Sequence, residues 1–159
     1  MNKIYLLLGS NMGNSKKQLS IAQQYLSERI GLVTRKSSLY QTAAWGNTNQ
    51  PDFINQVIVI SSTLNAADCI EKILAIEQHM GRIRTQKNAP RMIDIDILFF
   101  NKDLINLKNL VVPHPAIQNR RFVLIPLNEL SPNFIHPLLG ETVHQLLVKC
   151  PDKLDVKKI

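Results

Sequence analysis

The chain has 159 residues, 45% of them hydrophobic, with a formal net charge of +7 and a pI near 9.6. This length suits one domain with its own hydrophobic core, and no apolar run approaches the roughly 18–20 residues of a membrane-spanning helix. We therefore expect a single domain over residues 1–159 with no membrane span. The positive charge favours an anionic ligand: a nucleic acid, a nucleotide or another phosphorylated ligand.

The cysteines and the N-terminus indicate a compartment. Cys69 and Cys150 form neither a metal-binding motif nor a disulfide framework, which is typical of a reducing environment. The first residues are typical of a strand and lack the small-residue cleavage site of a signal peptide. We expect a cytoplasmic protein, and a monomer.

The first half of the chain predicts three strands and one helix. Hydrophobic residues recur at helical spacing between residues 15 and 29, and Gly31 is typical of a helix end. A Gly-Ser-Asn turn at residues 9–11 precedes this helix and matches neither a Walker A nor a dinucleotide-binding motif. The predicted elements are a strand over 4–8, a helix over 15–29, a strand over 33–40, a loop over 41–52 and a strand over 53–63.

The second half predicts three more helices and one strand. Asn65 is a typical N-cap, and Gly81 is typical of the position after a helix end. The predicted elements are a helix from 65 to 80, a strand over 91–100, a proline-containing loop over 112–115 and helices over 119–130 and 141–148. The opening order, strand–helix–strand–strand–helix–strand, predicts a ferredoxin-like α+β fold with an antiparallel sheet.

Two aspartates lie inside the predicted strand over 91–100. Because side chains alternate along a strand, Asp94 and Asp96 share one face while Ile93, Ile95 and Ile97 share the other. Two carboxylates about 6–7 Å apart repel each other unless a cation lies between them, and oxygen ligands of this kind suit Mg²⁺. The alternative is a strand with one solvated polar face.

Arginines precede this strand closely. Arg82, Arg84 and Arg91 lie upstream of the aspartates, together with Lys87. Guanidinium groups bind phosphate in a bidentate manner and stay charged. A metal-binding carboxylate pair beside such a cluster favours polyphosphate chemistry, in which charge stabilisation does most of the catalytic work.

Other polar and aromatic residues are candidates for ligand contacts. Phe53 and Asn55 share a face of their strand and could stack on and read a flat heterocycle, and the competing explanation is core packing with an asparagine ladder partner. His114 lies between two prolines that restrict its loop. Arg120 and Arg121 open the next predicted helix, where backbone N–H groups favour an anion.

Five segments taken together resemble one known family. They are Leu8-Gly9-Ser10-Asn11, Gln50-Pro51-Asp52-Phe53-Ile54-Asn55, Gly81-Arg82-Ile83-Arg84, Pro90-Arg91-Met92-Ile93-Asp94-Ile95-Asp96, and Val112-Pro113-His114-Pro115 with Asn119-Arg120-Arg121-Phe122. The chain resembles the 6-hydroxymethyl-7,8-dihydropterin pyrophosphokinases of folate biosynthesis. The resemblance implies a three-layer α/β/α domain that uses ATP and two Mg²⁺ ions. It also implies transfer of the β,γ-diphosphate of ATP to the pterin hydroxymethyl oxygen, which releases AMP.

The resemblance also implies roles for individual residues. The two metal ions would be held by Asp94 and Asp96. Catalytic arginines on a loop that closes over the phosphates would be Arg82 and Arg91. The residues implied to bind or line the ATP site are Glu77, Arg84, His114 and Arg120. The residues implied to bind the pterin are Thr42, Trp45, Phe53, Asn55 and Phe122.

Two departures from the family pattern leave alternatives open. The loop sequence Lys87-Asn88-Ala89-Pro90-Arg91 lacks the tryptophan and glycine that are usual there, and Leu74 replaces a common glutamine. One alternative is therefore a family member that binds both ligands without turnover. A second is a ferredoxin-like nucleic-acid-binding module, although two aspartates on a central strand would repel a phosphate backbone. Our leading expectation is an enzyme whose partners are small-molecule substrates, not nucleic acid.

Overall fold

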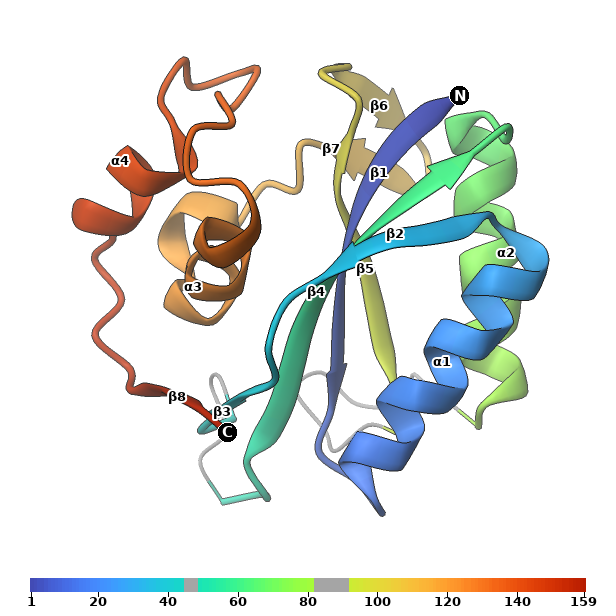
Figure 1. The fold of residues 1–159 in the computed structure, drawn as a ribbon, viewed down its shortest axis with the longest axis horizontal. Helices are drawn as coiled ribbons and strands as arrows, with labels where there is room; N and C mark the ends of the chain where they lie inside the picture. Colours follow the sequence, from blue (N-terminus) through green and yellow to red (C-terminus); the bar gives the residue numbers. More distant parts are fainter. Residues whose placement is uncertain (45–48, 82–91) are drawn as a thin grey trace.

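The computed structural model describes residues 1–44, 49–81 and 92–159 and shows an α+β fold (Figure 1). The elements in chain order are β1 (Asn2–Ser10), α1 (Ser15–Arg29), β2 (Leu32–Lys36), β3 (Tyr40–Thr42), β4 (Phe53–Ser62), α2 (Ala66–His79), β5 (Asp94–Phe100), β6 (Ile105–Leu107), β7 (Leu110–Val112), the 3₁₀ helix η1 (Ile117–Asn119), α3 (Arg121–Leu130), α4 (Val143–Val148) and β8 (Val156–Lys158). No helix in the described ranges is long and apolar enough to cross a membrane.

The central sheet is antiparallel and has the predicted ferredoxin-like order. Its strands follow the sequence β5-β1-β4-β3-β8, and β2 pairs with β4 on the same side as β3. Helices α1 and α2 cover one face, and α3 and α4 cover the other (Figure 1). The predicted three-layer α/β/α arrangement is therefore confirmed.

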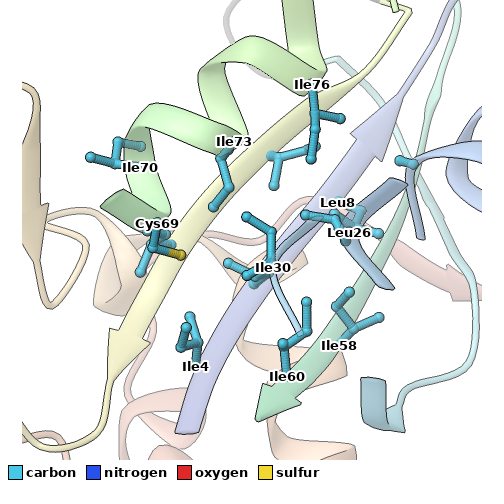
Figure 2. Close-up of a cluster of buried hydrophobic side chains, with 14 of the residues drawn as sticks. Ile4, Leu8, Leu26, Ile30, Ile58, Ile60, Cys69, Ile70, Ile73 and Ile76 are labelled. Atoms are coloured by element: carbon cyan, nitrogen blue, oxygen red, sulfur yellow. The ribbon is translucent and has the colours of Figure 1, made fainter. Parts of the chain in front are cut away.

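Alternation along β1 divides the interior into two hydrophobic cores. Ile4, Leu6 and Leu8 point toward α1 and α2, whereas Tyr5 and Leu7 point toward α3 and α4. Figure 2 shows the first core, in which isoleucines of α2 meet the isoleucines and leucines of the sheet. Each fully buried aliphatic side chain contributes roughly 1.5–3 kcal/mol to the free energy of unfolding. The two cores therefore stabilise the sheet on which the candidate site residues lie.

The predicted helix ends are confirmed for α1 and α2. Helix α1 has the predicted bounds, and Asn65 caps α2 by accepting a hydrogen bond from the Asp68 N–H at 2.8 Å. Gly81 has a φ of 90°, the left-handed conformation predicted for it. Gly31 is required for a different reason. A Cβ atom there would lie 2.1 Å from the carbonyl oxygen of Ser61, so only glycine allows the chain to pass β4.

The predicted strand over 33–40 is in fact two strands, β2 and β3. The pairing with β4 breaks at Ser37. Its N–H still donates to the Val57 carbonyl at 2.8 Å, but the Val57 N–H donates to Ser37 Oγ at 3.0 Å and not to a backbone carbonyl. The pairing of β2 with β4 also shifts between Val33 and Arg35. The single-strand prediction was wrong because a hydroxyl group can replace a backbone acceptor.

The strands β6, β7 and β8 were not predicted. Each has three residues, which is too short for an alternating pattern to be recognised. The turn predicted at residues 9–11 was also placed too early, because Gly9 and Ser10 pair with Asn55 and Ile54 and extend β1. Helix α3 begins two residues later than predicted, after η1.

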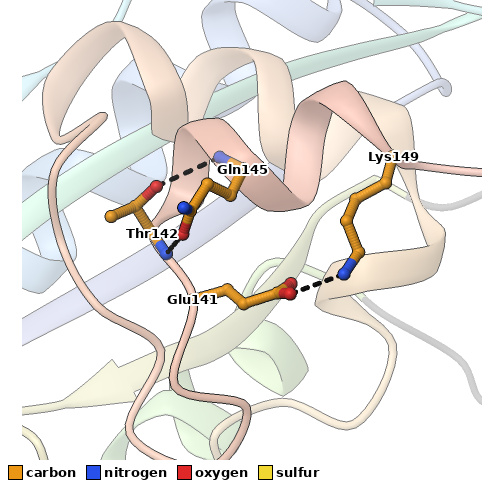
Figure 3. Close-up of polar contacts among 4 residues, drawn as sticks. All are labelled: Glu141, Thr142, Gln145 and Lys149. Carbon is orange, nitrogen blue, oxygen red and sulfur yellow. Dashed lines mark hydrogen bonds and ion pairs between the residues drawn. The ribbon is translucent and has the colours of Figure 1, made fainter.

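Helix α4 also begins two residues later than predicted, at Val143. Thr142 and Gln145 form a capping box, in which the Gln145 N–H donates to Thr142 Oγ1 and the Thr142 N–H donates to Gln145 Oε1 (Figure 3). This box fixes the first turn at Thr142. Glu141 lies outside the helix and pairs with the exposed Lys149 (Figure 3).

The hairpin before α4 depends on a buried, neutral histidine. His136 Nδ1 accepts hydrogen bonds from the N–H groups of Leu138 and Leu139 at 3.2 and 3.1 Å, and burial lowers the pKa of the imidazole. Nδ1 must therefore be unprotonated in the folded protein. A proton on Nδ1 would remove both bonds and place a charge in the core.

This arrangement predicts an acid-sensitive stability. In the unfolded chain His136 takes up a proton below about pH 6.5, whereas the folded protein resists it. The contribution is thus complete above about pH 6.5 and is lost as the pH falls toward the folded pKa. In urea unfolding between pH 5 and 8, His136→Asn should flatten this loss, because the asparagine oxygen accepts in place of Nδ1 but does not titrate. Parallel curves for the two proteins would contradict the prediction, and the lowered pKa of His114 affects both equally.

Candidate functional site

The two aspartates of β5 lie on one face of the sheet, as predicted. Asp94 pairs with Gly9 and Asp96 with Leu7, so both share the face that α3 and α4 cover. Ile93, Ile95 and Ile97 are buried on the opposite face. The isoleucines fix the register of the strand, because a one-residue slip would bury both carboxylates.

Phe53 and Asn55 lie on the same face two strands away. Gly9 of β1 pairs with Asp94 on one side and with Asn55 on the other. Adjacent strands are about 4.8 Å apart, so the backbones of Asp94 and Asn55 are separated by roughly 10 Å. The sheet therefore places the two aspartates on one side of Gly9, which has no side chain, and Phe53 and Asn55 on the other side.

The side-chain amide of Asn55 is buried and oriented by Thr42. Its Nδ2 donates to Thr42 Oγ1 at 3.0 Å, which leaves Oδ1 above Gly9. The amide can then offer an acceptor and its second N–H to a ligand, a combination that matches the edge of a heterocycle with amide character. Thr42 thus lies beside Asn55, and the structure shows its side chain as a support for that amide.

Sequence reasoning missed Gly9. A Cβ atom at this position would lie 2.9 Å from Asn55 Oδ1 and 3.6 Å from a ring carbon of Phe53. Only glycine, which has no side chain, leaves the sheet surface between Asp94 and Asn55 uncovered. The signal was available, because an isolated glycine within a strand pattern indicates close approach. The neighbouring serine and asparagine instead favoured a turn.

The loop after β1 supports the entry to β4. Asn11 is buried and donates from Nδ2 to Gln50 Oε1 at 2.8 Å and to the Pro51 carbonyl at 3.0 Å. These bonds hold the segment that leads to Phe53 against the segment that follows Gly9. Residues far apart in the sequence are thereby fixed at the same end of the sheet.

His114 is half-buried and lies near Asp94. Its backbone N–H donates to the Leu98 carbonyl of β5 at 3.0 Å, and its Nδ1 accepts from the Ala116 N–H at 3.1 Å. Burial and the nearby Arg120 guanidinium lower the pKa of the imidazole, and the charge of Asp94 opposes this shift. The neutral ring therefore carries its proton on Nε2, which makes that nitrogen a hydrogen-bond donor.

Arg120 and Phe122 stand at the start of α3. The Arg120 guanidinium lies 5.8 Å from the centre of the Phe122 ring, a cation–π distance. The effect of Arg120 on His114 shows that both side chains lie near each other. Helix α3 also contacts β3 and β4, and in its last turn Glu129 accepts hydrogen bonds from the hydroxyl groups of Ser38 and Tyr40. The helix therefore lies over the sheet face that carries Asn55.

Glu77 occupies the other side of β5. It belongs to α2, is 2% exposed, and accepts a hydrogen bond from the Ile95 N–H at 2.8 Å. Ile95 lies between the two aspartates. The carboxylate of Glu77 therefore fixes the backbone that carries both of them, rather than sharing their face.

Several predicted site residues lie outside the described residues. They are Trp45, Arg82, Arg84 and Arg91. The structure thus describes the carboxylate side and the aromatic–amide side of the candidate site, while the predicted arginine cluster stays a prediction from sequence.

The donor set at Asp94 and Asp96 fits a magnesium ion. Both residues are half-buried on one strand face and supply only carboxylate oxygens. Among the described residues, no group of three or more His, Cys, Asp and Glu side chains could hold a metal ion. Magnesium commonly binds to one or two carboxylates and completes its shell with water and substrate phosphates, so two aspartates suffice.

A separate groove lies between α1 and β2. Its volume is about 450 Å³ and its lining includes Gln23, Gln24, Thr34 and Arg35. None of the predicted site residues lines it. We find no chemistry in this groove that competes with the sheet face described above.

The chain is similar to proteins of one family. The family described as 7,8-dihydro-6-hydroxymethylpterin-pyrophosphokinase matches residues 5–132. The chain is 37% identical over 150 residues to a 2-amino-4-hydroxy-6-hydroxymethyldihydropteridine pyrophosphokinase of Methylorubrum extorquens, covering 94% of each protein. It is 38% identical over 141 residues to one of Synechocystis, covering 88% of this chain and 72% of the relative.

Longer proteins also match. The folic acid synthesis protein FOL1 of Dictyostelium discoideum is 34% identical over 158 residues, which cover 99% of this chain and 24% of that protein. The crystal structure of Plasmodium falciparum HPPK-DHPS with pteroate has a TM-score of 0.76 and 19% identity, covering 93% of this chain and 42% of that chain. At that identity the structural match supports the fold alone. The chain spans less than half of these two longer proteins.

Proposed function

Because the chain belongs to the 7,8-dihydro-6-hydroxymethylpterin-pyrophosphokinase family, a group of enzymes of folate biosynthesis, we propose that it transfers diphosphate from ATP to 6-hydroxymethyl-7,8-dihydropterin. In this reaction the hydroxymethyl oxygen forms a bond to the β-phosphorus of ATP. The bond from that phosphorus to the bridging oxygen breaks, and AMP leaves with that oxygen. We propose that residues 1–159 act as one monomeric, cytoplasmic domain.

One observation carries the proposal. The carboxylates of Asp94 and Asp96 and the amide of Asn55 share a sheet face, with the side-chain-free Gly9 between them. A spacing of roughly 10 Å between Asp94 and Asn55 leaves room for a heterocycle edge at one side and a polyphosphate at the other. A transfer between the two ligands needs this side-by-side placement.

The carboxylate side is proposed to hold two Mg²⁺ ions through Asp94 and Asp96. When bound, Mg²⁺ neutralises phosphate charge and acts as a Lewis acid toward phosphate oxygens. Ile93, Ile95 and Glu77 hold β5 from the opposite face, which keeps the two carboxylates in place before any ligand arrives. Such preorganisation avoids a reorganisation cost during the reaction.

The nucleotide side is proposed to include His114 and Arg120. The Nε2–H of neutral His114 can donate to a phosphate or ribose oxygen, because Nδ1 is engaged by Ala116. Arg120 adds a positive charge close to His114, and this charge contributes to the lowered pKa of the imidazole. Arg82, Arg84 and Arg91 are proposed to complete this charge from their loop and to exclude water from the transferred group.

The pterin side is proposed to use stacking and edge recognition. Phe53 and Phe122 supply aromatic rings from β4 and α3, which suits a planar ligand. Asn55, held by Thr42, reads the edge by hydrogen bonds, and Trp45 contributes from the preceding loop. Stacking alone tolerates any flat ring, so the selectivity for pterin is assigned to the amide.

The decisive test measures AMP released from Mg-ATP with and without 6-hydroxymethyl-7,8-dihydropterin. We expect AMP only when the pterin is present, no ADP, and loss of the activity when EDTA removes Mg²⁺. ADP in place of AMP would indicate transfer of one phosphoryl group and would overturn the proposed reaction. Binding of both ligands without AMP would identify a family member without turnover. Salt-sensitive RNA binding without ATP turnover would favour the nucleic-acid alternative.

A further inference from the structure

The last ten residues contact two elements of the candidate site. Strand β8 pairs antiparallel with β3, with Val156 opposite Thr42 and Lys158 opposite Tyr40. The Ile159 N–H donates to the Leu39 carbonyl at 3.0 Å and extends this contact. The tail thereby forms the outer neighbour of the strand whose Thr42 orients Asn55.

Asp152 attaches the same tail to α3. It is 8% exposed, and its Oδ2 accepts from the Arg121 N–H at 2.9 Å while its Oδ1 accepts from the Leu154 N–H at 2.9 Å. Arg120, the residue at the N-cap position of α3, makes no side-chain cap hydrogen bond. A carboxylate 31 positions after Arg121 therefore caps the helix, where negative charge is favourable.

The capped turn carries two predicted ligand residues. Arg121 lies between Arg120 and Phe122, so the hydrogen bond that its N–H donates to Asp152 fixes the backbone from which both side chains project. Figure 1 shows the chain running from α4 past α3 and ending as β8 beside β3. The tail thus connects the first turn of α3 to β3.

We propose that residues 152–158 brace the pterin site by setting the position of the first turn of α3 relative to β3, with Asp152 as the positioning residue. This inference rests on the proposed function. The brace lies beyond residues 5–132, the part of the chain that the family match covers. Asp152 touches neither substrate and acts through Arg121 and the helix that follows.

The two attachments give different expectations. Asp152→Ala removes the cap beside Arg120 and Phe122, so it should weaken the binding of both the pterin and an ATP analogue, each by about fivefold to tenfold. A chain that ends at Leu154 keeps the N–H that donates to Asp152 but lacks β8, so it loses the pairing with β3 and the contacts of β8 with α3. It should weaken the pterin by a similar factor and affect the ATP analogue less than Asp152→Ala does. Asp152→Asn keeps one acceptor oxygen and should restore part of the loss.

Equilibrium binding of the pterin and of a non-hydrolysable ATP analogue with Mg²⁺ tests this pattern, with the melting temperature of each variant recorded. Lys149→Ala is the matched control, because it breaks only the exposed ion pair with Glu141 near the start of the same tail (Figure 3). It should bind both ligands like the wild type.

Two outcomes would overturn the brace. One is unchanged pterin affinity in the shortened chain. The other is an Asp152→Asn protein that melts earlier but binds both ligands normally, because Asp152 would then serve stability alone. If Asp152→Ala does not fold, the Asp152→Asn protein and the shortened chain decide. A wild type that releases no AMP would instead refute the proposed function, so the two failures are distinguishable.

Discussion

Asp96→Ala is expected to lower pterin-dependent AMP release by roughly 10³-fold or more, because the site loses several kcal/mol of metal-mediated charge stabilisation. The fold should persist, since Asp96 belongs to neither hydrophobic core. The carboxylate lies on a strand whose register the buried isoleucines fix. Steady-state AMP formation with saturating Mg-ATP measures the effect.

A second measurement separates loss of metal binding from a general defect. Mg²⁺ with an ATP analogue should raise the melting temperature of the wild type and raise that of Asp96→Ala much less. Asp103→Ala is the matched control, because it removes an exposed carboxylate in the turn after the same strand. An Asp96→Ala protein with metal-dependent activity near that of the control would exclude the proposed role of this carboxylate.

Gly9→Ala is expected to reduce kcat/KM for the pterin by about 10²-fold while leaving the affinity for the ATP analogue largely unchanged. The added Cβ atom would lie 2.9 Å from Asn55 Oδ1, so the amide must move away. Its Nδ2 is held by Thr42, and a displacement of roughly 1 Å in a positioning group can cost this much in rate. Kinetics with varied pterin at saturating Mg-ATP test the prediction.

A double-mutant cycle shows whether the clash with Asn55 is the cause. The free energy of unfolding that Gly9→Ala costs in the wild type should be mostly absent in an Asn55→Ser background, because the shorter side chain no longer meets the new methyl group. Additive effects on stability would locate the strain elsewhere. Binding of Mg²⁺ and the ATP analogue, measured without pterin, is the internal control. It should be largely unchanged in Gly9→Ala, since Asp94 lies on the other side of Gly9 from Asn55.

Local patterns gave most of the regular structure. The helix over 15–29, the Asn65 cap and the left-handed Gly81 all follow from interactions within a few residues, which the sequence displays directly. Short elements were the exception. Strands β6, β7 and β8 form because a neighbouring strand provides backbone hydrogen-bond partners. Three residues are too few to show an alternating pattern in the sequence.

For the candidate site too, local patterns predicted some features and long-range contacts decided others. The sequence by itself determined the fold class, the shared face of Asp94 and Asp96 and the shared face of Phe53 and Asn55, because strand alternation has a period of two and needs no partner. Only the tertiary structure decided that these two faces are the same face, since that depends on how β5, β1 and β4 pair. It also decided that Gly9 separates them, that Thr42 orients Asn55, and that Asp152 caps α3. These contacts join residues that lie far apart in the chain or depend on strand register, which local spacing does not encode.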